Sequence, residues 1–261
     1  MRVSALSYSF FPMTRAGMMD VFGYLETIRY RYALTVADLW NWTLTSHDEQ
    51  YLRAVRRSLE ERELELASLN VSNYIVWHDY AAIRNYNHRL ILDCLRMAET
   101  LGAQTVSIEA GGHHEAQSYT EEQFDYIAMR YREYAQRAYD HGYLMGPENH
   151  FGPELVPAEM RRLCEAVDHP GFGFLLHAGN WQGDDAAQGN VLLAPWAMHV
   201  HLPDSLSDAQ LVETMTSLRD ADYDGAWSVE AVNGGTYAQV GAMIARVGRV
   251  LEGWRLDTEQ P

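Results

Sequence analysis

Ionisable side chains stand at the ends of several short apolar runs, mostly in the second half of the chain. They occur at Glu109, Glu148-Asn149-His150, His177-Ala178-Gly179-Asn180, His199-Val200-His201 and Glu230. A strand of a soluble protein normally keeps ionisable groups out of its buried interior, so this repeated pattern is unusual. Two carboxylates and two imidazoles that meet at one point are typical of a mononuclear divalent-metal site. We therefore predict that one cation is held by Glu148, His177, His201 and Glu230.

The individual residues of this set have alternative interpretations. A single Glu at a strand end is most often part of a surface ion pair, and only the four donors together indicate a shared function. His177 could be a metal ligand, a substrate contact or a hydrogen-bonded structural residue. Side chains alternate along a strand, so His199 and His201 point to the same side. His201 lies closer to the strand end and is the better ligand, whereas His199 would contact the substrate or support a ligand from behind.

Aromatic and amide side chains near the strand ends indicate a polyhydroxylated substrate. Tryptophans occur there at Trp40, Trp42, Trp77 and Trp181, and asparagines at Asn73, Asn149 and Asn180. Each indole either packs in the core or lines the site, where it would stack on the apolar face of a sugar ring. The amides would bind hydroxyl groups. The predicted substrate-binding residues are His150, His199, Asn180, Asn73, Trp40 and Glu109.

Short apolar runs alternate with longer amphipathic stretches along the chain, which indicates parallel strands joined by helices. The eight predicted strands are Val3–Tyr8, Thr35–Leu39, Glu65–Asn70, Thr105–Glu109, Tyr143–Glu148, Gly173–His177, Ala197–Leu202 and Trp227–Glu230. The clearest helical periodicities cover Tyr80–Leu101, Glu121–His141 and Val240–Trp254. Units of about 33 residues match an α/β fold, the (β/α)8 TIM barrel, whose chemistry gathers at the carboxyl ends of the strands. A doubly wound open sheet is disfavoured because the residues after the first strand lack a glycine-rich phosphate loop. No segment resembles a linker, so residues 1–261 are expected to form a single domain.

The composition excludes several kinds of function. All 20 Lys and Arg positions of the 261-residue chain are arginines. Schiff-base chemistry and pyridoxal phosphate anchoring need a lysine and are therefore excluded. The formal net charge of −16 argues against nucleic acid as a partner. The chain lacks a long apolar run and a signal-like N-terminus, so we expect no membrane association and a cytoplasmic location.

The sequence resembles the xylose-isomerase-like barrels, in particular the sugar phosphate isomerase/epimerase group. The matching stretches are Ser7-Tyr8-Ser9-Phe10, Asp20-Val21-Phe22-Gly23-Tyr24-Leu25-Glu26, Ala37-Asp38-Leu39-Trp40-Asn41, Glu148-Asn149-His150, Gly179-Asn180, His199-Val200-His201-Leu202 with Asp204, and Ser228-Val229-Glu230. Similar members of that family hold one divalent metal through a Glu after the fifth strand, an Asp after the sixth, a His after the seventh and a Glu after the eighth.

The resemblance places these ligands at Glu148, His177, His201 and Glu230, with imidazole in place of the sixth-strand carboxylate. Asp184 or Asp185 could supply a carboxylate from the following loop instead. The metals implied are Mn2+, Co2+, Zn2+ or Mg2+. One carboxylate fewer should weaken Mg2+ binding relative to the softer ions.

The resemblance also implies a function. In the family's ketose epimerases two Glu residues act on opposite faces of the substrate, one removing the proton next to a carbonyl and the other returning it. Glu148 and Glu230 are thus the predicted catalytic residues of a metal-dependent isomerase or epimerase that acts on a small sugar or polyol derivative through an enediolate. The alternatives are a lyase on the same scaffold, either a dehydratase or a C-glycoside-cleaving subunit, and a sugar-binding barrel without turnover. Many similar barrels form dimers or tetramers, so a homo-oligomer is a further expectation.

Overall fold

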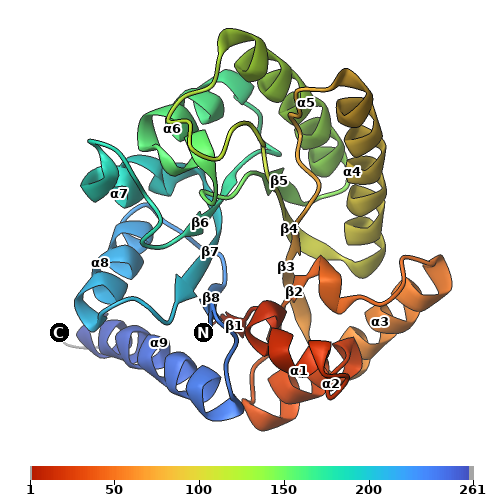
Figure 1. Cartoon of the computed structure of the whole chain (residues 1–261). Helices are drawn as coiled ribbons and strands as arrows, with labels where there is room; N and C mark the ends of the chain where they lie inside the picture. Colours follow the sequence, from red (N-terminus) through yellow and green to blue (C-terminus); the bar gives the residue numbers. More distant parts are fainter. Residues whose placement is uncertain (1, 259–261) are drawn as a thin grey trace.

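The strands and helices of the computed structural model, which describes residues 2–258, alternate around a ring (Figure 1). Its strands are β1 (Val3–Ala5), β2 (Val36–Trp40), β3 (Glu65–Val71), β4 (Ala103–Ile108), β5 (Leu144–Gly146), β6 (Phe174–His177), β7 (Ala197–Pro203) and β8 (Trp227–Glu230). Its α-helices are α1 (Phe11–Arg15), α2 (Val21–Glu26), α3 (Glu49–Glu61), α4 (Ala81–Leu101), α5 (Glu121–Asp140), α6 (Pro157–Val167), α7 (Gly189–Leu193), α8 (Asp208–Arg219) and α9 (Tyr237–Thr258). Among the described residues, no helix is long and apolar enough to cross a membrane.

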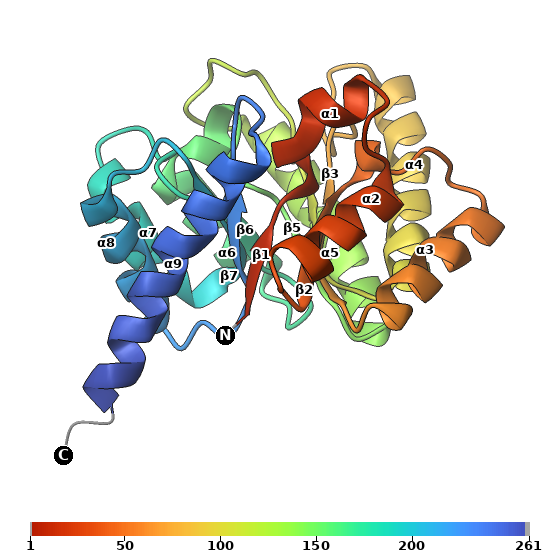
Figure 2. The same cartoon turned by 90° about the horizontal axis from the view of Figure 1, so that it is seen from below.

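The strands are parallel and close into a barrel. Regular ladders join β2, β3, β4 and β5 in one sheet and β6, β7, β8 and β1 in another. Single bridges complete the ring, between Leu6 and Asp38 on one side and between Glu148 and Leu175 on the other. The first and last strands therefore lie side by side, with the helices outside them (Figure 2). The predicted (β/α)8 barrel is confirmed.

The first and fifth strands are each three residues shorter than the sequence pattern predicts. The first ends at Ala5 rather than Tyr8, because Ser7–Phe10 turns into a 3-10 helix at the mouth of the barrel. The fifth covers only Leu144–Gly146, because the next residue, Pro147, has no N–H to donate to a ladder. Beyond this point the bridge between Glu148 and Leu175 and the hydrogen bonds between Asn149 and His177 join the two strand ends.

Hydroxyl side chains cap the starts of two of the helices, α5 and α8. Thr120 and Gln123 form a reciprocal capping box at the start of α5, and Ser207 and Gln210 form one at the start of α8. Each box satisfies backbone N–H groups that a helix start leaves without partners. The α4 helix ends at Gly102, whose left-handed backbone suits glycine.

Polar residues two positions apart on the same strand face the inside of the barrel. These pairs are Ser68 and Asn70 on β3, His199 and His201 on β7, and Ser228 and Glu230 on β8, and all are buried. Apolar residues between them, such as Leu69, Val200 and Val229, belong to the core under the helices. Strand alternation thus separates a polar interior from an apolar outer layer.

Candidate metal centre and active site

The four predicted ligands converge at the carboxyl ends of β5 to β8. His177 Nδ1 lies 3.0 Å from Glu148 Oε1 and 3.6 Å from Glu230 Oε2. His201 Nδ1 lies 3.7 Å from the same Glu148 oxygen and 3.4 Å from the same Glu230 oxygen. All four side chains line one cavity of about 200 Å³. Residues from four separate strands therefore surround a common point.

These donors fit a divalent cation in type, and Glu148, His177 and His201 lie close enough together to hold one, with Glu230 beside both imidazoles. Around a tetrahedral ion with ligand bonds of about 2.1 Å, neighbouring donors lie about 3.4 Å apart, close to the distances seen here. Within residues 2–258, His201 Nδ1 and Glu230 Oε2 are buried and have no hydrogen-bond partner. Unpartnered buried polar atoms are costly, and a cation between them would satisfy both. Mixed oxygen and imidazole donors suit Mn2+, Co2+ and Zn2+.

The charges around this point favour a cation. Burial opposes ionisation of Glu148, but the hydrogen bond from His177 and the nearby imidazole of His201 hold its pKa well below the ordinary value. Burial raises the pKa of Glu230, and the same imidazoles offset this only in part. Although burial favours neutral imidazole, the pKa of His201 is raised well above its ordinary value by Asp38 and Glu148. The negative charge of the carboxylates would thus stabilise a cation at the centre.

The neighbouring Asn149 holds His177 in place. The backbone N–H of His177 donates to Asn149 Oδ1 at 2.6 Å, and Asn149 Nδ2 donates to the His177 carbonyl at 3.1 Å. The asparagine is fully buried. This pair of bonds joins the segment after β5 to the end of β6, so Glu148 and His177 are fixed relative to each other.

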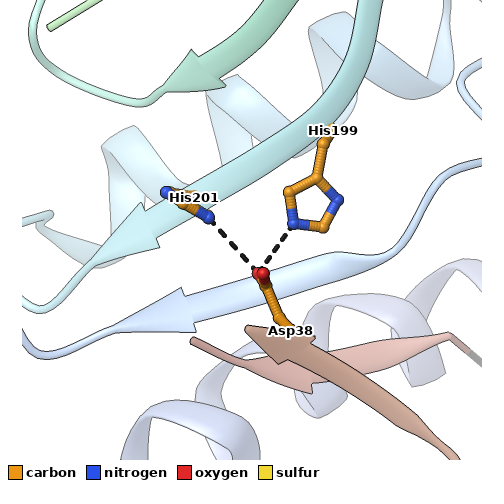
Figure 3. Close-up of side chains that lie close together, drawn as sticks. All are labelled: Asp38, His199 and His201. Atoms are coloured by element: carbon orange, nitrogen blue, oxygen red, sulfur yellow. Dashed lines mark hydrogen bonds and ion pairs between the residues drawn. The ribbon is translucent and has the colours of Figure 1, made fainter. Parts of the chain in front are cut away.

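Behind the centre, the carboxylate of Asp38 on β2 supports both histidines of β7. His199 Nε2 lies 2.8 Å and His201 Nε2 lies 3.3 Å from Asp38 Oδ2, and both imidazoles point toward this oxygen (Figure 3). The Ser228 hydroxyl donates to the same oxygen. Despite complete burial, the two imidazoles hold the pKa of Asp38 below its ordinary range. Asp38 Oδ2 is therefore a buried carboxylate oxygen that accepts from three donors.

Aromatic and apolar side chains form the rest of the cavity wall. Trp40 and Tyr8 both line it, and their rings pack edge to face with 5.0 Å between the ring centroids. The Trp40 Nε1–H donates to Ser72 Oγ at 2.9 Å, which fixes the ring. Leu6 and Val232 complete the apolar part. One side of the cavity is thus suited to carbon-bound hydrogens and the other to oxygens.

The fold and this donor set agree with a family comparison. Residues 33–247 match the model of the family described as xylose isomerase-like TIM barrel. The chain belongs to this family. A comparison with curated proteins finds no match.

Solved structures of related barrels cover almost the whole chain. A D-tagatose 3-epimerase-like protein is 16% identical, with a TM-score of 0.75 over 99% of this chain and 100% of that one. The 3-keto-D-glucoside 4-epimerase YcjR from E. coli is 15% identical, with a TM-score of 0.74 over 97% of this chain and 99% of that one. AsbF from Bacillus anthracis, described as a probable 3-DHS dehydratase, is 15% identical, with a TM-score of 0.72 over 95% of this chain and 99% of that one. At such identities the likeness establishes the fold, and the chemistry must be argued from the site.

Of the predicted substrate-binding residues, some line the cavity and others lie outside its wall. Trp40 and His150 line the cavity. Glu109 lies behind His150, with 3.7 Å between Glu109 Oε1 and His150 Nδ1, and its carboxylate, with Glu148, raises the pKa of His150 to about 9 against the effect of burial. His199 is buried against Asp38 rather than in the cavity wall.

The two predicted amides also lie outside the cavity wall. The Asn180 side chain donates to the Asn149 carbonyl at 3.2 Å. Asn73 is exposed in a turn with a left-handed backbone. The cavity is lined instead by Asn70, three residues earlier. Asp184 and Asp185, considered as substitutes for the sixth-strand carboxylate, are exposed. The substrate-binding roles stay predictions.

Sequence reasoning missed Asp38 and Asn70 as members of the site. Asp38 interrupts the apolar run Val36–Trp40, and Asn70 interrupts Leu66–Val71, so both carry the same signal as the strand ends of the second half. They belong to strands that are far away in sequence from the four predicted ligands. Only barrel closure brings β2 and β3 across from β7.

A further buried carboxyl, Glu154, lies beyond the centre. It belongs to the 3-10 helix Gly152–Leu155, and its Oε1 accepts from the Ala110 N–H at 2.6 Å. Its other oxygen is buried and has no hydrogen-bond partner in the described part of the chain. Burial, and to a smaller extent the nearby Glu109 charge, raise the pKa of Glu154 well above 4.5.

We expect Glu154→Gln to change the pH dependence of stability. The folded state binds the Glu154 proton more tightly than the unfolded state does, so this group's contribution is complete at acid pH and is lost as pH rises toward the folded-state pKa. The unfolding free energy of the wild type should fall by about 1.4 kcal/mol per pH unit relative to the variant in that window. Urea unfolding of both proteins across pH 5–8 measures the difference. A difference that does not vary with pH would contradict the prediction.

Proposed function

We propose that this protein is a divalent-metal-dependent isomerase or epimerase of a small sugar or polyol derivative. The observation that carries the proposal is the convergence of four donor atoms from Glu148, His177, His201 and Glu230, with distances of 3.0 to 3.7 Å between imidazole nitrogens and carboxylate oxygens. The two unpartnered buried atoms among them support a resident cation. The family membership supports the same class of chemistry.

The two carboxylates are suited to moving a proton on and off a carbon atom. Glu148 follows β5 and Glu230 ends β8, with two strands between them, so they can approach a substrate from different sides. A bound divalent ion would supply Lewis-acid polarisation of the substrate carbonyl and adjacent hydroxyl. One carboxylate would remove the proton next to the carbonyl, and the other would return a proton to the same carbon or its neighbour. Return to the same carbon from the other face is epimerisation. Return to the neighbouring carbon, together with transfer of a proton between the two oxygens, is isomerisation.

The size and lining of the cavity support a substrate of one sugar unit. Its volume of about 200 Å³ is below the roughly 300–1,000 Å³ of pockets for drug-sized ligands. Trp40 and Tyr8 offer aromatic faces to the apolar side of a sugar, while Asn70, Ser72 and His150 offer hydrogen-bonding groups. A polyhydroxylated compound with one polar and one apolar side suits this lining.

Metal analysis and solvent exchange test the proposal together. Protein stripped with a chelator and reloaded with Mn2+, Co2+ or Zn2+ should retain one ion per chain after desalting. The loaded protein should incorporate deuterium from heavy water into carbon positions of at least one sugar in a panel of ketoses and aldoses, followed by NMR. Retention of almost no metal would instead favour a sugar-binding barrel without turnover.

Elimination of water is the second candidate. It begins with the same proton abstraction, and His150, which lines the cavity, is placed to protonate a departing hydroxyl. The likeness to a dehydratase fold is consistent with this chemistry. Mass spectrometry distinguishes the candidates, because elimination lowers the product mass by one water whereas isomerisation and epimerisation leave the mass unchanged.

A further inference from the structure

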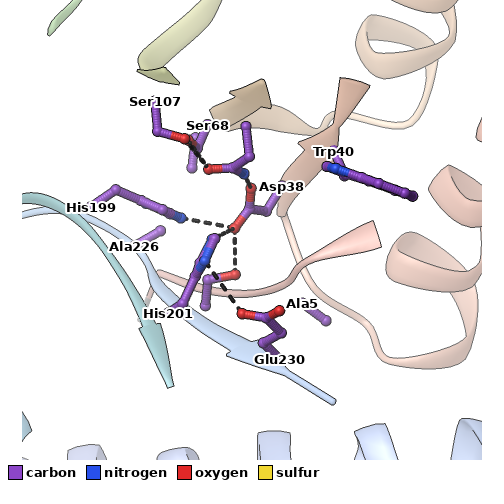
Figure 4. Close-up of polar contacts among 12 residues, drawn as sticks. Ala5, Asp38, Trp40, Ser68, Ser107, His199, His201, Ala226 and Glu230 are labelled. Atoms are coloured by element: carbon purple, nitrogen blue, oxygen red, sulfur yellow. Dashed lines mark hydrogen bonds and ion pairs between the residues drawn. The ribbon is translucent and has the colours of Figure 1, made fainter. Parts of the chain in front are cut away.

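We propose that Asp38 is a positioning residue that sets the tautomer of His201, so that His201 Nε2 carries the proton and Nδ1 is left free to bind the cation. The inference rests on the proposed metal centre. His201 Nε2 faces Asp38 Oδ2 at 3.3 Å, while Nδ1 faces Glu230 Oε2 at 3.4 Å. Asp38 and Glu230 thus lie on opposite sides of the imidazole (Figure 4). An ionised carboxylate can only accept, so the nitrogen facing Asp38 must donate.

A chain of polar groups fixes which atoms of Asp38 accept. Asn70 Nδ2 lies 2.6 Å from Asp38 Oδ1 and 3.3 Å from the Leu39 carbonyl. A backbone carbonyl only accepts, so the Asn70 amide must present its nitrogen to this side. Its Oδ1 accepts from the hydroxyls of Ser107 at 3.0 Å and Ser68 at 3.3 Å. The orientation of Asn70 is therefore determined from both ends, and Asp38 Oδ1 must accept.

The backbone of Asp38 is held as firmly as its side chain. The hydroxyl of Tyr24, a buried residue of α2, accepts from the Asp38 N–H at 2.8 Å and lies 2.7 Å from the Ala5 carbonyl. It thereby bridges the gap in the barrel between β1 and β2. A carboxylate held at both ends in this way can impose one tautomer on its histidine partner, as outer carboxylates do for metal-bound imidazoles.

Asp38, His199 and His201 could themselves form a second cation site, since their donor atoms lie close together. The hydrogen bonds argue against this. Asp38 Oδ2, His199 Nε2 and His201 Nε2, the atoms that face the shared centre, are all engaged with one another. Among the residues that the structure describes, His201 Nδ1, on the other edge of the ring, is the atom of this group without a partner. Asp38 and His199 therefore support the single proposed cation site at His201 Nδ1 and do not form a second cation site.

Replacement of Asp38 by Asn should exchange donor and acceptor in the hydrogen bond between residue 38 and His201. Asn70 presents N–H groups, so the new amide must turn its oxygen toward Asn70 and its NH2 toward His201. His201 would then accept at Nε2 and carry its proton at Nδ1, where the cation would bind. We expect Zn2+ and Mn2+ affinity, measured by calorimetry on chelator-stripped protein, to fall by about 10–100-fold.

The double variant Asp38→Asn/Asn70→Asp provides a rescue. It moves the carboxylate to position 70, where it can accept from Ser68, Ser107 and the amide introduced at position 38. The oxygen of that introduced amide can then face His201 and restore the original tautomer. We expect this variant to recover metal affinity at least about tenfold over Asp38→Asn, a tenfold change in affinity being about 1.4 kcal/mol. A matched control is Ser228→Ala, which removes another donor to the same Asp38 oxygen but leaves the carboxylate, and should retain the wild-type tautomer.

Histidine 15N NMR separates positioning from a merely structural role. In metal-free protein, at a pH high enough for His201 to be neutral, the proton should be on Nε2 in the wild type and on Nδ1 in Asp38→Asn. The proposal would be overturned by a wild-type His201 that carries its proton on Nδ1, or by an Asp38→Asn variant whose His201 keeps the proton on Nε2. It would also be overturned if Asp38→Asn kept full metal affinity or if the wild-type chain bound two ions. Absence of metal binding by the wild type would refute the proposed function, while the tautomer measurement would still decide the role of Asp38. If Asp38→Asn does not fold, the wild-type tautomer and ion count remain decisive.

Discussion

Replacing Glu230 by Gln should reduce solvent-proton exchange at the substrate carbon by at least about 100-fold, and Glu148→Gln should do the same. Removal of a positioned general base or acid typically costs about 10²–10⁴ in rate. Gln preserves the shape of the side chain, but its amide cannot take up a proton at neutral pH. Both residues also face the candidate metal centre, so weaker metal binding would add to the loss.

The exchange assay compares each variant with the wild type at saturating metal. Glu165→Gln is a matched control, because this Glu is largely exposed on α6 and pairs with Arg161 on the same helix. It should exchange at the wild-type rate. Exchange at the wild-type rate in both Glu148→Gln and Glu230→Gln would refute the catalytic assignment. Loss of exchange in only one would show that a single residue both removes and returns the proton.

Gly146→Ala is expected to destabilise the barrel by about 3 kcal/mol or more, the upper part of the range for overpacked interiors. A Cβ atom at Gly146 would lie 1.7 Å from the backbone oxygen of Gly173. A backbone carbonyl cannot swing away as a flexible side chain can, so β5 and the start of β6 would have to separate. This separation would displace Glu148 relative to His177, so metal affinity should fall as well.

Thermal unfolding and calorimetry with Zn2+ check both consequences. For a chain of this size a loss of about 3 kcal/mol corresponds to a Tm lower by roughly 6–12 °C. The control is Gly248→Ala in α9, where an added Cβ meets no atom within 4 Å among the described residues and should raise stability by about 1 kcal/mol. A Gly146→Ala protein with unchanged Tm and metal affinity would show that the strands can adjust without cost.

The barrel was predictable because its signals are local. Apolar runs bounded by helical periodicities place each strand without knowledge of the rest of the chain. The errors were local as well. The strand expected to continue to Tyr8 stops at Ala5, and the one expected to reach Glu148 stops at Gly146 before a proline.

The positions of polar residues at strand ends were enough to identify the side chains that could meet at the barrel mouth. Glu148 follows a strand, His177 and Glu230 end one, and His201 lies two residues before the end of β7. Parallel strands in a closed barrel must bring those ends together. The supporting side chain behind these ligands, Asp38, could be identified only from the three-dimensional structure. Asp38 is 163 residues from His201, and their contact arises because barrel closure turns β2 and β7 toward the same interior. Such a hydrogen bond depends on strand tilt and side-chain direction across the barrel, which no local pattern encodes.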